Sequence, residues 1–217
     1  VKDKTKYKFI WYPLNERDIP TPQDKVYDVC YHGGMHGQKY TSVLQDIMPF
    51  NYRYMTMTHG INQLTQKCIP YATDLNLSNE EKMERIAQCK ISVCMNSFTV
   101  RGSADLNNIK SQPSYLDNNA FIHAEEQGLC PQIKSRMNEA AACKTLNLVE
   151  EDLWNIAETF YRPYEHFLYF ERGKLTEAIS EVLDHWDIYK GLAESAHKHF
   201  KNNYTTKKLY HRIKNDE

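Results

Sequence analysis

The sequence has little net charge, no long apolar run and no paired-cysteine motif, and each absence argues against a class of protein. Its 27 Lys and Arg residues nearly balance its 28 Asp and Glu residues, giving a formal net charge of −1. This balance does not favour nucleic-acid binding. No apolar stretch approaches the ~18 residues that a transmembrane helix needs. No signal-peptide pattern is present either, so we expect a globular protein that does not span a membrane.

The cysteines lack the C-x-x-C spacing that zinc sites and dithiol sites share. Most of them lie inside apolar stretches, so we predict free, largely buried thiols in a reducing compartment, the cytoplasm. The six residues are Cys30, Cys68, Cys89, Cys94, Cys130 and Cys143.

At 217 residues the chain can form one large domain or two small ones, and its 41% apolar content suffices for a real core. Prolines at positions 13, 20 and 22 interrupt regular structure near the start. We therefore divide the chain into a lead-in over residues 1–24, with a possible edge strand at 8–12, and one domain over residues 25–217.

Strand and helix patterns alternate through that domain, which predicts an α/β fold with a doubly wound, mainly parallel sheet and helices on both faces. Residues 97–130 have the least regular pattern, although a short strand is possible at 121–123. The predicted strands span 25–31, 52–57, 90–95, 145–149 and 166–170, and the predicted helices span 40–48, 79–88, 175–183, 186–196 and 204–213, with a further helix beginning at Pro131.

The helix predicted from Pro131 carries two cations and a carboxylate close to its start. Lys134, Arg136 and the helix N–H groups form a candidate anion site. Glu139 lies further along, where a carboxylate can accept hydrogen bonds from two neighbouring sugar hydroxyls. Phosphate donors and a ribose acceptor on one helix suit a nucleotide. The alternative is a solvated charge cluster on a surface helix.

A glycine pair follows the first predicted strand. In the stretch His32-Gly33-Gly34-Met35-His36, the bare backbone of the glycines can approach a phosphate. His59 follows the next predicted strand, where open α/β sheets bind their ligands. The alternatives are a simple tight turn between strand and helix, and a structural histidine.

The order of these elements resembles the C-terminal, nucleotide-sugar-binding half of GT-B, group-1-like glycosyltransferases, a branch found in bacteria and large DNA viruses. The resemblance covers roughly residues 25–213. It is carried best by the stretch 131–139, the small-residue run 140–143 and the strand 145–149. The tail, with Phe160-Tyr161-Arg162-Pro163 and Leu168-Tyr169-Phe170-Glu171, also fits.

The resemblance implies a role for each candidate residue. Glu139 matches the carboxylate that holds the nucleotide ribose, and Lys134 and Arg136 match cations near the diphosphate. Gly33 and Gly34 match the glycine turn at the phosphates. By position alone, Asn96 and Ser97 lie where the family reads the base. For a catalytic base we favour His32 or His36, with His59 as a further candidate near the nucleotide sugar.

The implied activity is transfer of a sugar from a nucleotide diphosphate, with UDP as the default carrier, to a glycan acceptor. A deoxyhexose such as rhamnose is one candidate sugar. The sequence contains no D-x-D motif, so we expect transfer without an obligate metal cofactor. Two alternatives remain open: a non-catalytic module that binds a nucleotide sugar, and a sugar-nucleotide epimerase.

Two departures from the family pattern affect this interpretation. Pro131 stands where retaining members often carry a second glutamate, so the stereochemistry stays open. The family's N-terminal acceptor domain also has no counterpart before residue 25. We expect adjacent domains in a longer polypeptide or a partner chain, although a fold reduced to one domain is a third alternative.

Overall fold

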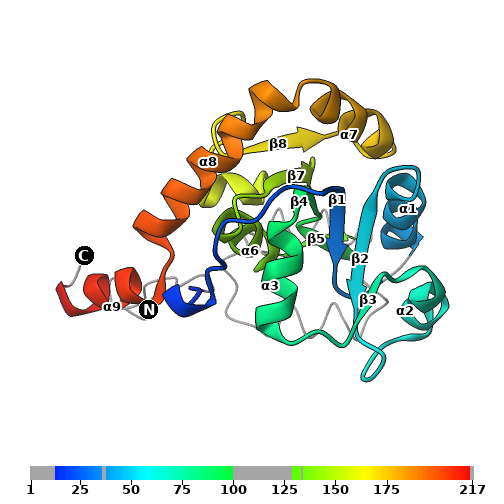
Figure 1. Cartoon of the computed structure of the whole chain (residues 1–217), viewed down its shortest axis with the longest axis horizontal. Helices are drawn as coiled ribbons and strands as arrows, with labels where there is room; N and C mark the ends of the chain where they lie inside the picture. The colour runs from blue at the N-terminus through cyan, green and yellow to red at the C-terminus, as the bar shows by residue number, and fades with distance from the viewer. Residues whose placement is uncertain (1–12, 36–37, 100–128, 133, 216–217) are drawn as a thin grey trace, which may run out of the picture.

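The computed structural model describes residues 13–35, 38–99, 129–132 and 134–215. Its centre is a six-stranded parallel sheet with the order β3-β2-β1-β4-β7-β8 (Figure 1). The chain builds outward from β1 to β3, returns to the middle at β4 and then builds outward in the other direction. The order therefore reverses between β1 and β4, where doubly wound sheets bind ligands beyond the strands' carboxyl ends. The strands of this sheet are β1 (Tyr27–His32), β2 (Tyr52–Thr56), β3 (Asp74–Leu75), β4 (Cys89–Cys94), β7 (Leu146–Glu150) and β8 (Phe167–Phe170).

Helices cover both faces of the sheet because successive strand residues point to opposite sides. Val29 and Tyr31 of β1 contribute to the core on one face, whereas Cys30 contributes to the core on the other. The first core includes side chains of α1, α7 and α8, and the second includes side chains of α3, α6 and α8. The α-helices are α1 (Gln38–Ile47), α2 (Gln63–Cys68), α3 (Asn79–Ala87), α6 (Arg136–Ala142), α7 (Leu175–Asp184), α8 (Trp186–Asn203) and α9 (Thr206–Asn215). Short 3₁₀ helices occur at η2 (Glu16–Asp18), η3 (Ile69–Tyr71) and η4 (Ile156–Thr159).

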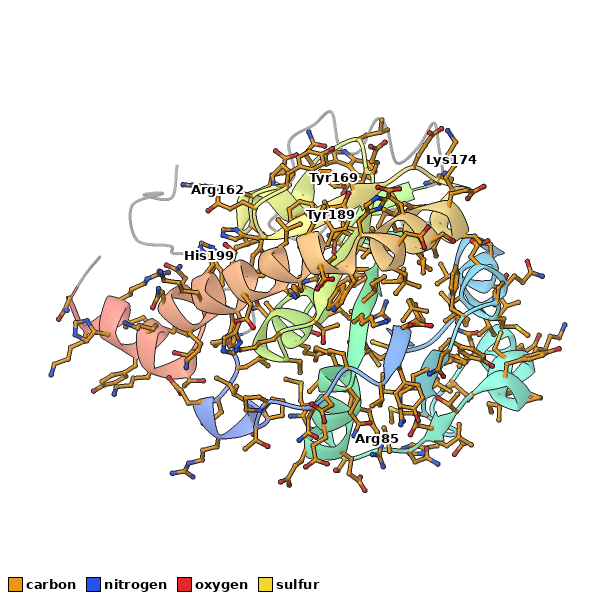
Figure 2. All side chains as sticks on the ribbon, turned by 45° about the horizontal axis from the view of Figure 1, so that its top comes forward. Arg85, Arg162, Tyr169, Lys174, Tyr189 and His199 are labelled. Atoms are coloured by element: carbon orange, nitrogen blue, oxygen red, sulfur yellow. The ribbon has the colours of Figure 1, made fainter. Side chains whose placement is uncertain are left out.

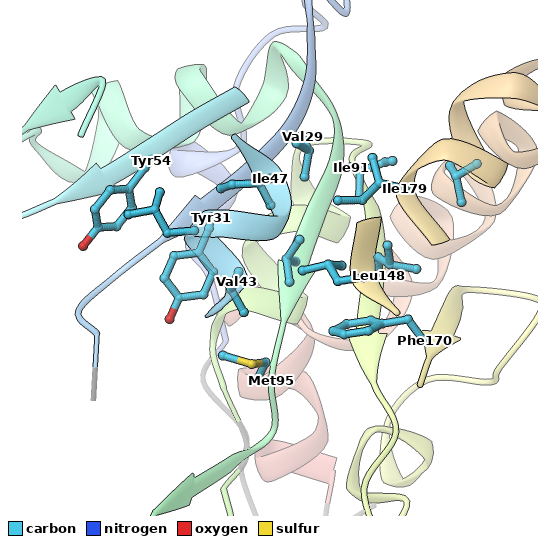
Figure 3. Close-up of a cluster of buried hydrophobic side chains, with 14 of the residues drawn as sticks. Val29, Tyr31, Val43, Ile47, Tyr54, Ile91, Met95, Leu148, Phe170 and Ile179 are labelled. Carbon is cyan, nitrogen blue, oxygen red and sulfur yellow. The ribbon is translucent and has the colours of Figure 1, made fainter. Parts of the chain in front are cut away.

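The first core joins the two halves of the sheet. Figure 3 shows Ile47 of α1 and Ile179 of α7 beside strand residues such as Ile91. All three side chains are fully buried. At about 1.5–3 kcal/mol for each fully buried aliphatic side chain, such contacts make a large contribution to folding. They hold the carboxyl ends of the strands in fixed register.

The predicted strands and helices are largely confirmed. A capping box of Ser78 and Glu81 begins α3. The predicted start of the helix at Pro131 is wrong. Pro131 ends β6 (Leu129–Pro131), which pairs antiparallel with β5 (Ser97–Thr99), and α6 begins only at Arg136. The pairing holds the backbone extended, so Lys134 precedes the helix instead of belonging to it. The expected strands at 8–12 and 121–123 lie outside the described residues.

The segment before β1 contacts the far end of the chain. Leu14 pairs with the backbone on both sides of Thr205, through its N–H to Tyr204 and its carbonyl to Thr206. Figure 1 shows this segment beside the junction of α8 and α9. Residues 13–24 therefore pack against the domain, a contact that no local sequence pattern predicts.

The prediction of buried thiols is confirmed where side chains are described. Cys30, Cys68, Cys89, Cys94 and Cys143 are buried and free. The side chain of Cys130 lies outside the described set. Among the helices that the structure describes, none has the length and apolar character needed to cross a bilayer.

Candidate functional site

A cleft of roughly 640 Å³ opens at the carboxyl ends of β1 and β2. Its walls are the turn after β1, the loop after β2 and the first residues of α3 and α6. This position beside the strand-order reversal is where parallel α/β sheets bind their ligands. The polar or glycine residues that line it include His32, Gly33, Gly34, Thr56, His59, Gly60, Thr65, Ser78, Asn79, Lys82, Ser135, Arg136 and Glu139.

A buried carboxylate joins three elements at the base of this cleft. Glu139 of α6 is only 7% exposed. Its Oε2 lies 3.3 Å from Nδ1 of His32, at the end of β1. Its Oε1 accepts a hydrogen bond of 3.0 Å from Nζ of Lys82, on α3. Within the part of the chain that the structure describes, each carboxylate oxygen has one partner, which leaves a second lone-pair site for a ligand hydroxyl.

The charges of this group follow from its burial. Burial lowers the pKa of His32 to about 3, against the upward pull of Glu139. Burial alone would raise the pKa of Glu139, but the His32 N–H that faces the carboxylate and the charges of Lys82 and Arg136 hold that pKa below its ordinary value. We infer a neutral imidazole beside an ionised carboxylate. Nδ1 of His32 then carries the proton and faces Glu139, while Nε2 has no hydrogen-bond partner among the described residues.

The turn after β1 makes a second close contact, with Arg136. The Arg136 guanidinium lies over the Tyr31 ring, 4.6 Å from its centroid, and Nη1 donates a 3.0 Å hydrogen bond to the Tyr31 hydroxyl. A Cβ added at Gly33 would lie 2.1 Å from Nη2 of Arg136, and Gly33 has φ of +117°. The backbone conformation favours glycine, and a Cβ at this position would displace the end of the Arg136 side chain. The turn therefore fixes a cation at the edge of the cleft.

The structure brings six of the predicted site residues to this one cleft: His32, Gly33, Gly34, His59, Arg136 and Glu139. His36 lies outside the described residues.

The remaining predicted residues lie elsewhere. Lys134 is not among the residues that line the cleft, and its Nζ donates to the side chain of Gln132. The buried side chain of Asn96 contacts Cys94 and Met137. Ser97 lines a different cleft. The ligand contacts expected of these residues stay predictions.

Two contributions from α3 were missed at the sequence level. Lys82 was read only as part of a helix, because no local pattern shows that its side chain reaches Glu139. Ser78, the N-cap of α3, also lines the cleft, beside Asn79. The one sequence signal for Lys82 was its place next to the apolar position Met83. A cation beside an apolar helix position is too common to identify a site.

The arrangement can bind an anion and orient an imidazole. Arg136 of α6 and Lys82 of α3 both line the cleft and supply positive charge from separate helices. Among the described residues, no group of three His, Cys, Asp or Glu side chains could hold a metal ion. The absence of a metal requirement stays a prediction.

Comparison with known proteins agrees with this fold. A family described as glycosyl transferase-like matches residues 71–215, which is more than half of the chain. No curated protein sequence matches the chain.

Several solved structures share the fold. HepE of Anabaena, in complex with UDP-glucose, superposes with a TM-score of 0.60 at 11% identity, covering 96% of this chain and 56% of HepE. Sucrose-phosphate synthase from Thermosynechococcus elongatus gives 0.58 at 11% identity, with 97% and 53% covered. TarM gives 0.53 at 9% identity, with 95% and 37% covered. Identities this low show the fold alone, and this chain spans between about a third and somewhat over half of each structure.

Proposed function

Because the chain belongs to the glycosyl transferase-like family, we propose that it binds a nucleotide-diphosphate sugar in the cleft beside β1 and transfers the sugar to a glycan acceptor. One observation carries this proposal. Two segments that are far apart in the sequence line one cleft at the carboxyl edge of the sheet. One contributes His32 and Gly33 at the end of β1, and the other contributes Arg136 and Glu139 of α6. A leaving diphosphate needs positive charge nearby as the glycosidic bond breaks.

Arg136 is the principal candidate for the diphosphate. Its guanidinium presents several donors in a fixed plane, which suits phosphate oxygens. The contact with Tyr31 holds that plane in place, and Gly33 lets the backbone approach closely. Lys82 supplies a second positive charge from α3. For Lys134 we propose only a more distant electrostatic contribution to diphosphate binding, since it does not line the cleft.

Glu139 and His32 are proposed to act together. The free lone pairs of Glu139 would accept hydrogen bonds from the ribose hydroxyls. With Nδ1 of His32 facing Glu139, Nε2 is the acceptor that could receive the proton of an attacking hydroxyl. A pKa of about 3 is too low for an efficient base, but the negative charge of a bound diphosphate would raise it. His36 stays the alternative base.

The finer features of the reaction are proposals as well. UDP is the proposed carrier, supported by the UDP-glucose bound to the structurally similar HepE. A deoxyhexose such as rhamnose remains one candidate sugar, transfer is proposed to need no metal, and membership of the viral branch stays a prediction. Asn96 and Ser97 are the proposed contacts for the base.

A second candidate function is a binding module that holds the nucleotide sugar while another domain or chain supplies the acceptor. This function is favoured because the chain corresponds to only 37% to 56% of the larger structures described above, so those structures contain a part that has no counterpart in this chain. In this case the donor cleft would work as proposed, but the chain alone would not catalyse transfer.

The donor cleft is tested by titrating UDP against the wild-type chain and against Arg136→Ala, using calorimetry and thermal shift. Loss of a charge-assisted contact should weaken binding by about 10-fold to 100-fold. Arg162→Ala is the matched control, since that side chain is 77% exposed and does not line the cleft. The proposed donor site is wrong if millimolar UDP leaves the melting temperature of the wild type unchanged, or if Arg136→Ala and Arg162→Ala bind UDP equally well.

Turnover separates the remaining alternatives. Hydrolysis of a UDP-sugar by the isolated chain, lost in Glu139→Ala, would support the enzyme. Tight binding without turnover would support the binding module. Conversion of the donor sugar with no acceptor present would instead indicate an epimerase.

A further inference from the structure

A groove of roughly 500 Å³ lies near the amino ends of β1 and β7, because Lys25 and Lys144, which line it, precede these strands by two residues. Its walls are the segment 19–25, the end of α6 and one side of α8. The proposed donor cleft lies at the other edge of the sheet, at the carboxyl ends of the strands. The two sites share no lining residue, so a ligand in the groove would leave the donor cleft open.

The wall that precedes β1 is held at both ends. At one end the chain pairs with the junction of α8 and α9, as described above (Figure 1). At the other, Nζ of Lys25 donates hydrogen bonds to the carbonyl oxygens of Ala87, at 2.8 Å, and Cys143, at 3.2 Å. These carbonyls lie at the ends of α3 and α6, where helices lack intrahelical partners. Pro20 and Pro22 restrict the backbone between the two attachments, so the wall is preorganised.

The backbone of this wall can pair with a ligand. In the part of the chain that the structure describes, the N–H and C=O groups of Thr21, Gln23 and Asp24 make no hydrogen bond. Thr21 and Gln23 are exposed and line the groove. A peptide laid along such a backbone can bond to it as an added strand bonds to the edge of a sheet. The wall therefore suits a ligand that has a peptide backbone of its own.

Basic side chains line the facing wall. Lys190, His197 and Lys201 lie on one side of α8, since the second and third follow the first by seven and eleven residues. At a rise of 1.5 Å per residue, this basic row extends over roughly 16 Å. Lys144 adds a cation from the end of α6. Among the described residues, Glu194 is the one carboxylate in the lining.

The other side of α8 packs against the protein. His199 follows Lys190 by nine residues, which is two and a half turns, so the two side chains lie on opposite sides of the helix. Figure 2 labels His199 on α8, and its Nε2 lies 2.8 Å from the carbonyl oxygen of Phe160. Lys190 and Lys201 are exposed instead. The helix is thus anchored on one side and presents the basic row to solvent on the other.

The lysines of the groove are available to a ligand. Lys144 pairs with Glu194 at 3.0 Å, and Lys190 pairs with Asp187 at 2.6 Å. Both carboxylates are well exposed, and ion pairs of this kind are weak. Lys201 has no hydrogen bond or ion pair with another described residue. Carboxylates of a ligand can therefore compete for all three lysines.

Lys144 occupies a backbone position that favours glycine. Its φ is +52°. Its N–H bonds to the carbonyl oxygen of Ala141, and the N–H of Thr145 bonds to that of Ala140, which ends α6 in a Schellman motif. Glycine is the usual residue at this point, so a lysine here is costly to the backbone. Strained positions cluster at functional sites, which agrees with a role for Lys144 in the groove.

We propose that this groove binds an acidic peptide segment of a partner protein. The peptide would lie extended between the wall before β1 and α8, with its carboxylates toward Lys144, Lys190 and Lys201. About five extended residues span the roughly 16 Å of the basic row. A single phosphate would reach only one or two members of that row. The proposal is independent of the transferase activity, because it uses no residue of the donor cleft.

The test is fluorescence polarisation with a labelled, capped hexapeptide, EVEVEV. Its alternation places the three carboxylates on one face of an extended chain. The neutral QVQVQV and the cationic KVKVKV are the matched probes. At about 50 mM salt, EVEVEV should bind at least about 10-fold more tightly than QVQVQV, and KVKVKV should not bind. Raising the salt to about 300 mM should weaken the binding of EVEVEV.

Two double variants locate the binding site. Lys190→Gln combined with Lys201→Gln removes two charges from the basic row and should weaken EVEVEV binding about 5-fold to 10-fold. Lys198→Gln combined with Lys208→Gln is the control, since it removes the same charge from exposed lysines that do not line the groove. The control should bind like the wild type, and both double variants should keep the melting temperature of the wild type.

Hydrogen exchange tests the backbone contact. Exchange of the amide protons of Thr21 and Gln23 should slow when EVEVEV binds, because these N–H groups gain acceptors. Saturating UDP should leave peptide binding unchanged, since the two sites share no residue.

The proposal is overturned if EVEVEV does not bind at millimolar concentration, binds no better than QVQVQV, or binds both double variants equally. It is also overturned if exchange at Thr21 and Gln23 does not change, or if UDP displaces the peptide. Tighter binding of inorganic triphosphate or a thymidine hexanucleotide would show a general anion site instead. Peptide binding without UDP binding rejects the donor site alone, and UDP binding without peptide binding rejects the groove alone.

Discussion

Oε2 of Glu139 lies 3.3 Å from Nδ1 of His32, so a helix and a strand that are distant in the sequence meet through a buried carboxylate and imidazole. This contact fixes which imidazole nitrogen carries the proton. It also depends on Lys82, because the ammonium group of Lys82 keeps the carboxylate ionised. The cleft thus contains a network of three residues. Lys82 keeps Glu139 ionised, and Glu139 determines which nitrogen of His32 carries the proton.

Removal of the ammonium from this network should be costly. Lys82→Met keeps most of the side-chain volume but leaves a carboxylate that is 9% exposed without its cation. We expect the free energy of unfolding to fall by about 2–4 kcal/mol, since an uncompensated buried charge is strongly destabilising. Urea unfolding at pH 7.5 measures the effect.

The matched control is Lys90→Met. Lys90 is as exposed as Lys82, at 27% against 26%, but its partner Asp28 is 28% exposed. An ion pair this accessible to solvent contributes about 0–1 kcal/mol. Equal losses in the two variants would show that the network around Glu139 has no special role.

Gly33→Ala should damage the site and the fold together. The added Cβ would lie 2.1 Å from Nη2 of Arg136, and φ at Gly33 is +117°. We expect a loss of about 1–3 kcal/mol from backbone strain and weaker UDP binding from displacement of the guanidinium. Gly173→Ala is the control, since a Cβ there meets nothing within 4 Å although φ is also positive, and Gly173 does not line the cleft. If both variants bind UDP alike, Arg136 is not positioned by this turn.

The sheet could be predicted because its evidence is local. Runs such as 90–95 and 145–149 are mostly apolar, as buried parallel strands are, and the helix 175–183 has a clear apolar face. The two-residue strand β3 could not be predicted, because its edge position next to β2 is set by tertiary contacts. The start of α6 was misplaced for a similar reason, since Pro131 is held extended by a strand distant in sequence.

The site was predictable only in part. Gly33 and Glu139 lie in recognisable local patterns, and the reversal of strand order brings those patterns to one cleft. Lys82 acts across elements, so its local sequence contains no sign of its partner. Trp154 likewise has no local pattern that shows its surroundings: it lines a separate cleft at the end of β7, and its indole N–H is buried without a partner among the described residues.

The small-residue run in α6 should not tolerate larger side chains. Ala140, Ala141 and Ala142 are at most 1% exposed, and α6 packs against α8 and β7. Ala141→Leu adds volume to a filled interior, and we expect a loss of about 1–3 kcal/mol. Ala178→Leu on the partly exposed side of α7 should change stability by less than about 1 kcal/mol. A neutral effect of Ala141→Leu, measured by thermal unfolding, would contradict the close packing of this helix.

The buried imidazole of His32 should make stability depend on pH in a defined window. Its pKa is lowered from 6.5 to about 3 in the folded chain. Below pH 6.5 the unfolded chain therefore takes up a proton that the folded chain does not, so stability falls as pH falls. The slope is about 1.4 kcal/mol per pH unit from this one group. Between pH 6.5 and 4.5, wild type should lose about 2–3 kcal/mol more than His32→Gln, which has no titrating group there.

Urea unfolding at pH 7.5, 6.5, 5.5 and 4.5 measures this difference. The window ends at 4.5 because protonation of Glu139, whose pKa is held below its ordinary value, destabilises the fold only at lower pH. His185→Gln serves as the control, since the His185 side chain is 51% exposed and lies far from Glu139 in the sequence, on the boundary of α7 and α8. Its stability should fall with pH in parallel with the wild type. If His32→Gln also runs parallel to the wild type over this window, folding does not lower the pKa of His32, and the inference of a buried imidazole that stays neutral down to acid pH is wrong.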